Sequence, residues 1–219
     1  MTNRTIEDEQ LLAWYFEDWL KKYFFSVLQI LENLAADLLP YVRTQALSLI
    51  SNLLRNKPEQ EHNLLKLLVN KLASAFSSDR IFLDCNSMQG DGERQICSRA
   101  SYHILQVLQT HPAMKAVVIR EMTSLIFAPV AASSKAKNTA NEHVRYYAAI
   151  TLNQTFLQPG DTSVALQLID VYFRMFEDLL AESKVAENDE DTHGKLISAI
   201  LTGVNRALPF AKLDAAEAR

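Results

Sequence analysis

The chain has 219 residues, 48% of them apolar, and its 22 Lys and Arg against 26 Asp and Glu give a formal net charge of −4. This balance is typical of a globular protein and excludes the disordered and collagen-like classes. Five Gly and six Pro are too few for the many tight turns of a β-sandwich, a barrel or a Rossmann-type fold, so the composition favours an all-α protein.

The periodicity of apolar residues predicts about eight helices and no strand. Pro40 begins a second helix, Pro58 ends it, and a third continues to residue 73. Later helices are predicted over residues 95–110, 112–127, 141–157, 162–183 and 195–207. The first helix carries a stripe of apolar residues spaced by three and four, which we expect to face the core: Leu12, Phe16, Trp19, Leu20, Tyr23, Val27, Ile30 and Leu34.

Three segments are predicted to be loops because polar residues, Gly or Pro interrupt the helical period there: residues 74–93, 128–140 and 184–194. We expect them to connect helices of one domain over residues 1–219. No uncharged run is long enough to cross a bilayer, and the first ten residues lack the basic and apolar regions of a signal peptide.

An internal repeat becomes visible when the helices are aligned on their small residues. Ala100 follows Ala46 by 54 residues, and Ala148 follows Ala100 by 48. Units of this length predict a solenoid of HEAT or armadillo type built from antiparallel helix pairs, with an unrelated helical bundle as the alternative. We expect the aligned positions to form the repeat core: Val42, Ala46, Ile50, Leu54, Ile96, Ala100, Ile104, Leu108, Val144, Ala148, Leu152 and Phe156.

No motif for catalysis, cofactor binding or metal binding is present in the sequence. The five glycines do not form a phosphate-binding loop, and the five histidines are scattered singly. Cys97 and His103, the one pair with a thiol and a base, fall on opposite faces of a helix because six residues separate them. We therefore predict no enzyme activity, no cofactor and no small-molecule substrate.

Charge is distributed unevenly along the chain. Both residues 1–20 and residues 177–193 are acidic, whereas residues 21–176 hold 16 Lys and Arg against 12 Asp and Glu. The mildly basic middle could bring one face to a phosphate backbone, and the alternative is an ordinary solvated surface.

Aromatic residues are concentrated in the first helix, where seven of the nineteen lie between Trp14 and Phe25. At 100° per residue, Trp14 and Phe25 fall on the side away from the expected core stripe, with Lys21 between them. We expect these three residues to bind a partner, and the alternative is that a neighbouring helix covers them.

Seven blocks of the sequence together carry a resemblance to a known protein family. The first three are WYFEDWLKKYFFSVLQILE at residues 14–32, LPYVRTQAL at 39–47 and KPEQEHNLLKLLVNKL at 57–72. The others are ASYHILQVLQTHPAMKAVVIRE at 100–121, RYYAAITLNQ at 145–154, LIDVYF at 168–173 and ILTGVNRALPFA at 200–211. In these collinear blocks, which cover most of residues 14–211, the sequence resembles the CCAAT-binding-factor or MAK branch of the nucleolar-complex (Noc) protein family.

The resemblance implies a non-catalytic scaffold of the nucleus and nucleolus that acts in ribosome biogenesis. Such proteins support the assembly and intranuclear transport of large-subunit pre-ribosomes by binding another nucleolar-complex protein and pre-ribosomal RNA, with no membrane involved. Two alternatives remain: a DNA-binding transcription regulator of CCAAT promoters and a cytoplasmic helical-repeat adaptor. Family members are longer, so we expect the chain to be part of the family domain, with residues 74–89 as an insertion.

Overall fold

The computed structural model describes residues 8–56, 59–73, 89–127, 135–183 and 190–211. Eight α-helices and one 3-10 turn account for most of these residues, and no strand occurs among them. In chain order they are α1 (Asp8–Ala35), α2 (Pro40–Asn56), α3 (Glu61–Ala73), α4 (Gln89–Thr110), η3 (Pro112–Met114), α5 (Lys115–Ile126), α6 (Lys135–Asn153), α7 (Thr162–Ser183) and α8 (Glu190–Ala211).

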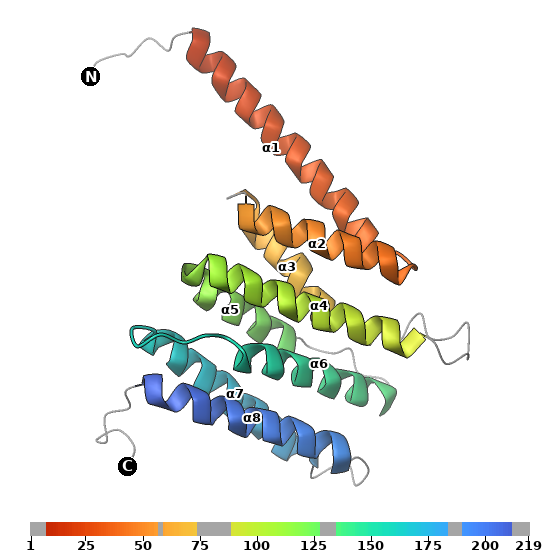
Figure 1. Ribbon diagram of the computed structural model, residues 1–219, viewed down its shortest axis with the longest axis vertical. Helices are drawn as coiled ribbons and strands as arrows, with labels where there is room; N and C mark the ends of the chain where they lie inside the picture. The colour runs from red at the N-terminus through yellow and green to blue at the C-terminus, as the bar shows by residue number, and fades with distance from the viewer. Residues whose placement is uncertain (1–7, 57–58, 74–88, 128–134, 184–189, 212–219) are drawn as a thin grey trace.

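The helices are stacked in two layers (Figure 1). Helices α2, α4, α6 and α8 lie side by side in the front layer, and α3, α5 and α7 lie behind them. Helix α1 packs against α2 at one end of the stack and projects away from it. This all-α arrangement is that of a helical-repeat solenoid, as predicted, whereas the repeat type, HEAT or armadillo, stays a prediction.

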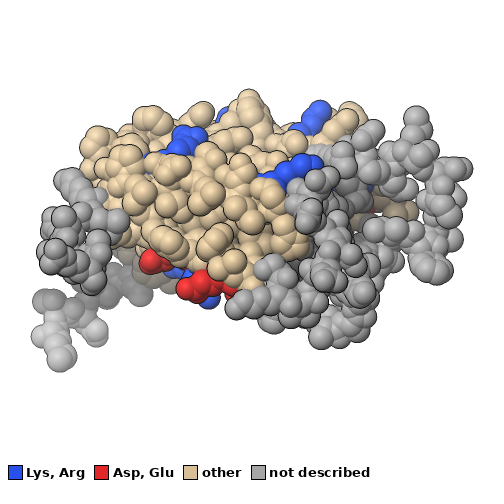
Figure 2. All heavy atoms as spheres, turned by 90° about the horizontal axis from the view of Figure 1, so that it is seen from below, with Lys and Arg blue, Asp and Glu red and all other residues tan. Residues whose placement is uncertain are grey.

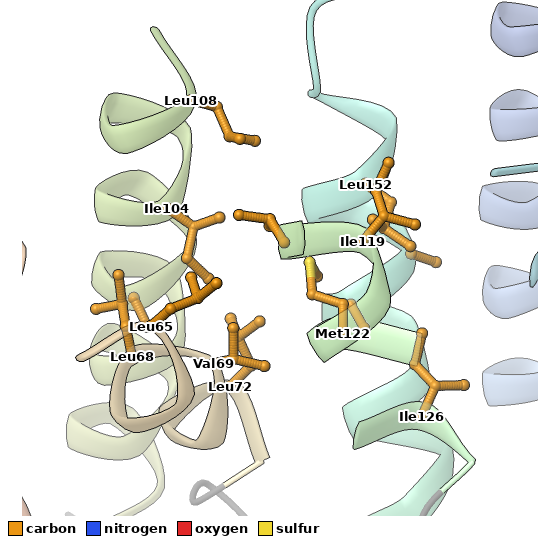
Figure 3. Packing of buried hydrophobic residues seen from close by; sticks show 14 of the residues in the cluster. Leu65, Leu68, Val69, Leu72, Ile104, Leu108, Ile119, Met122, Ile126 and Leu152 are labelled. Atoms are coloured by element: carbon orange, nitrogen blue, oxygen red, sulfur yellow. The ribbon is translucent and has the colours of Figure 1, made fainter. Parts of the chain in front are cut away.

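The core lies between the two layers and runs through the whole stack. Figure 3 shows Leu65 and Leu68 of α3 directed toward Ile104 of α4, with Ile119 of α5 close to Leu152 of α6. All five side chains are buried. Each buried side chain contributes about 1.5–3 kcal/mol to the free energy of folding relative to an exposed position, so burial of this core is the main source of stability.

Most of the expected repeat-core residues are buried. Val42 is half-buried, and Phe156 contradicts the expectation because its side chain is 70% exposed. Helix α6 ends at Asn153, three residues before Phe156, so the four-residue period no longer points that side chain into the core. The buried positions are Ala46, Ile50, Leu54, Ile96, Ala100, Ile104, Leu108, Val144, Ala148 and Leu152.

The predicted loops are too long at their carboxyl ends. Helix α4 begins at Gln89, α6 at Lys135 and α8 at Glu190, so residues 89–93, 135–140 and 190–194 are helical. Glycines in the first and third of these segments suggested loops, but a glycine costs a helix only about 1 kcal/mol. The rest of each predicted loop, and all but one residue of the expected insertion at 74–89, lies outside the described residues.

Helices α6, α7 and α8 meet at Gly203 of α8. A Cβ atom there would lie 2.4 Å from Asn153 Oδ1 and 2.4 Å from Tyr172 Cζ. The Tyr172 hydroxyl donates a hydrogen bond to Asn153 Oδ1 at 2.6 Å, and Asn153 Nδ2 donates to the Ala199 carbonyl at 2.8 Å. The absence of a side chain at Gly203 therefore lets α8 approach this buried polar contact.

Candidate partner-binding surface

Helix α1 is docked on the solenoid only near its carboxyl end. Leu28, Leu31 and Ala35 are buried, and Phe24 and Val27 are partly buried against the core. Every side chain from residue 8 to residue 23 is exposed. The first half of α1 is therefore a helix that projects into solvent, as Figure 1 shows.

Apart from Val27, the apolar stripe expected to face the core is exposed instead. Phe16, Trp19 and Tyr23 stack along α1, with ring centroids 6.0 Å and 5.6 Å apart, and each side chain is more than half exposed. At 100° per residue, this stripe lies about 120° around the helix from the docked face. The sequence contains two apolar faces with the same period, and the helix uses the one formed by Phe24, Leu28, Leu31 and Ala35.

The expected partner-binding residues lie on a third side of α1, distinct from the docked face and from the aromatic stripe: Trp14, Phe25 and Lys21. Trp14 is 56% exposed and Phe25 is 46% exposed, and no described helix covers either residue. Lys21 Nζ forms an ion pair with Glu17 at 2.7 Å. The hydrogen bond to Glu17 raises the pKa of Lys21 above its ordinary value.

The projecting half of α1 has local features that favour a preformed helix. Lys22 pairs with Asp18 at 2.7 Å, one turn along, as Lys21 does with Glu17, and such i,i+4 pairs favour the helical state. Asp8 and Glu9 place negative charge at the positive end of the helix dipole. The helix can therefore present aromatic side chains from several sides at once to a macromolecular partner.

The structure brings no metal-binding cluster together among the described residues. Within those residues, no three His, Cys, Asp or Glu side chains are close enough to hold a metal ion. Cys97 is buried, with its thiol 3.3 Å from the Leu72 carbonyl, whereas the His103 ring lies 3.5 Å from Ser48 Oγ. In the part of the chain described, no helix has the length and apolar character needed to cross a membrane.

The exposed aromatic surface of α1 is larger than the pair of residues predicted to bind a partner. It also includes residues that the apolar period predicts to be in the core, because Leu12, Phe16, Trp19 and Tyr23 are as exposed as Trp14 and Phe25. The crowding of seven aromatic residues on one helix was the available signal, because a single docked face cannot bury them all.

Three known proteins are similar to nearly the whole chain. Ribosome biogenesis protein NOC1 of Chaetomium thermophilum is 39% identical over 93% of the chain. An uncharacterized protein of Schizosaccharomyces pombe is 37% identical over 97%, and human CCAAT/enhancer-binding protein zeta is 34% identical over 96%. The chain is a homologue of these three proteins. The family resemblance drawn from the sequence blocks is thereby confirmed.

The chain covers only a small part of each of these relatives. It corresponds to 26% of the Schizosaccharomyces pombe protein, 20% of the Chaetomium protein and 17% of the human protein. No family model matches the chain.

Proposed function

We propose that the chain is a non-catalytic scaffold in ribosome biogenesis that binds another nucleolar-complex protein through the projecting half of α1. The observation that carries this proposal is the exposed aromatic surface of α1, since apolar side chains are rarely left in solvent over so much of one helix without a partner. The class of process is suggested by the name of the Chaetomium relative, Ribosome biogenesis protein NOC1.

The scaffold is proposed to act in the nucleus and nucleolus on large-subunit pre-ribosomes. Its stacked helices form a rigid support, and α1 supplies the aromatic anchors that usually dominate the binding energy of an interface. Contact with pre-ribosomal RNA and a role in the intranuclear transport of the particle belong to the same proposal. Imaging of the tagged chain tests the location, and exclusion from the nucleus would contradict it.

Affinity purification from cells tests the α1 surface. We expect the double variant Trp14→Ala, Phe25→Ala to recover at least about tenfold less nucleolar-complex protein, because two anchors at about 1–2 kcal/mol each are lost. Its helical circular dichroism should not change, since both residues lie outside the core.

A matched control removes two exposed aromatic residues away from α1. Phe156 and Phe173 are 70% and 55% exposed, and the variant Phe156→Ala, Phe173→Ala should recover the partner as the unaltered chain does. Equal recovery with both double variants would remove α1 from the proposed function.

A further inference from the structure

Helices α7 and α8 form one end of the stack, and no described helix lies beyond them (Figure 1). Figure 2 looks at this end from below. Most of its coloured surface belongs to uncharged residues, and the visible Lys, Arg, Asp and Glu spheres lie toward the upper and lower edges. This end of the solenoid is therefore poor in charge between its two edges.

Apolar residues of both helices repeat in steps of three and four outside the core positions. Such a row keeps its side chains on one side of a helix and is typical of a surface that packs against another helix. The α7 row and the α8 row are together called the end face: Leu166, Ile169, Phe173, Phe176 and Leu180 with Ile197, Leu201, Val204 and Leu208.

The two rows point away from the rest of the stack. On α7, Arg174 lies 4.4 Å over the ring of Phe127, the residue that follows α5. On α8, the Ala199 carbonyl accepts a hydrogen bond from Asn153 of α6. At 100° per residue, these contacts lie roughly 120° and 170° around their helices from the middle of each row. The end face is therefore directed outward, where Figure 2 shows the uncharged surface.

The end face is large enough for a stable interface. Phe173 and Leu201, at its centre, are 55% and 54% exposed, and Leu166, Leu180 and Leu208 are also exposed. Two helices of about 20 residues each cover about 30 Å by 20 Å, or about 600 Å². Covered by an equal surface, the face would bury about 1,200 Å² in total, which is the lower bound for specific stable interfaces.

We infer that the end face binds the end face of a second copy of this chain. Each copy offers two apolar rows of the same length and the same spacing, so the surface is complementary to itself. Pairing of one patch with the same patch follows a two-fold axis and closes after two copies. The four helices at the contact would form a bundle with its own apolar core.

Charge at one edge of the end face favours contact between α7 and α8 of the two copies. Asp170 and Glu177 are exposed and form an acidic row beside the apolar row of α7. Contact of α7 with α7 would bring two acidic rows together, which is unfavourable. Contact of α7 with α8 places each acidic row beside neutral groups that can donate hydrogen bonds, from exposed residues of the second copy: Ser198, Thr202 and Asn205.

Sedimentation of the 219-residue chain tests this inference. We expect twice the mass of one chain, with a dissociation constant below about 10 µM. The single variants Phe173→Lys and Leu201→Glu should each weaken the dimer at least about tenfold, because a charge is buried in an apolar contact. The matched controls are Tyr102→Lys and Leu49→Glu, which make the same changes at exposed positions of the front layer and should change the dissociation constant less than about twofold.

A mixture of the two end-face variants tests the contact of α7 with α8. These helices are antiparallel and are joined between residues 183 and 190, so Phe173 and Leu201 lie at about the same level. In a dimer of Phe173→Lys with Leu201→Glu, one contact pairs the introduced lysine with the introduced glutamate, and the other keeps the original pair. Mixing should therefore restore dimerisation, whereas either variant alone should stay monomeric at the same concentration.

A monomer at every concentration up to about 100 µM, or a dimer that both end-face variants leave intact, would overturn the inference. A mixture that stays monomeric would overturn the contact of α7 with α8. The α1 variant Trp14→Ala, Phe25→Ala should dimerise normally, and loss of the dimer in that variant alone would place self-association on α1 instead. Failure of this inference and failure of the proposed partner site are therefore distinguishable.

Discussion

Asp161 holds the connection between α6 and α7 through several interactions. Its Oδ2 accepts a hydrogen bond from Lys115 Nζ at 2.5 Å and another from the Gln158 amide at 3.0 Å, and its carbonyl accepts from the Ala165 amide in the first turn of α7. Lys115 is buried, so Asp161 is the carboxylate that neutralises a cation inside the stack. One residue thus fixes both the start of α7 and its position against α5.

The charge of Asp161 should make the free energy of unfolding depend on pH in the acidic range. The hydrogen bond from Lys115, followed by that from Gln158, holds the pKa of Asp161 below its ordinary value. A carboxylate whose pKa is lower in the folded state stabilises the fold above the unfolded pKa of about 3.9, and this contribution is lost as pH falls through the folded pKa. We expect Asp161→Asn to lower the free energy of unfolding by about 2–4 kcal/mol at pH 7, because Lys115 keeps a buried charge without a carboxylate.

Denaturant unfolding at a series of pH values measures this effect. The difference between Asp161→Asn and the unaltered chain should narrow as pH falls below about 3.9. Asp170→Asn, an exposed carboxylate on α7, serves as the control and should change stability by less than about 0.5 kcal/mol. A difference that stays constant across the pH series would show that the Asp161 charge does not contribute.

At the scale of the element, α1 combines two different environments in one helix. Residues near its carboxyl end are buried against the solenoid, whereas residues 8–23 are exposed on all sides. A helix of that length without tertiary contacts is marginally stable in water, so its stability depends on the docked end and on the two ion pairs with Lys21 and Lys22.

Hydrogen exchange should divide α1 into these two parts. We expect backbone amides of residues 12–23 to exchange at least about 100-fold faster than those of the stacked helices α6 and α8, because opening the projecting part exposes no buried surface. Amides of residues 28–35 should be intermediate or slow. Uniform protection along α1 would mean that the projecting half is covered, for example by a second copy of the chain.

At the scale of the whole molecule, each helix of the solenoid is stabilised by the helices that lie next to it. Helix α8 packs on α6 and α7, and α1 packs on α2 at the other end. A change at one end should therefore affect local stability there more than at the far end.

Gly203→Ala should loosen the α8 end of the stack. The added Cβ would lie 2.4 Å from Tyr172 and Asn153, and the buried Tyr172 ring cannot move aside without disturbing its hydrogen bond. We expect a loss of about 1–3 kcal/mol in the free energy of unfolding, with faster amide exchange in α8 than in α3.

Gly194→Ala is the matched control in the same helix. No atom lies within 4 Å of a Cβ placed at Gly194, so alanine should stabilise α8 by about 0.5–1 kcal/mol through its higher helix propensity. If both substitutions stabilised the chain, close packing at Gly203 would not be the reason for glycine at that position.

The sequence by itself determined the class of fold, the family and most helix positions. The bounds of α7 agree with the predicted residues 162–183 at both ends, and Pro159, Gly160 and Asp161 interrupt the helical period just before its start. The aromatic crowding on α1 likewise identified the helix with the exposed surface.

Only the tertiary structure decided which apolar face of α1 is buried. Both faces repeat with the same helical period in the sequence, so the face that is buried is the one against which the other helices pack. It also placed Phe156 in solvent, since α6 ends before the repeat pattern does. The side-by-side arrangement of α2, α4, α6 and α8 in one layer was likewise decided by the tertiary structure, because these helices are distant in sequence.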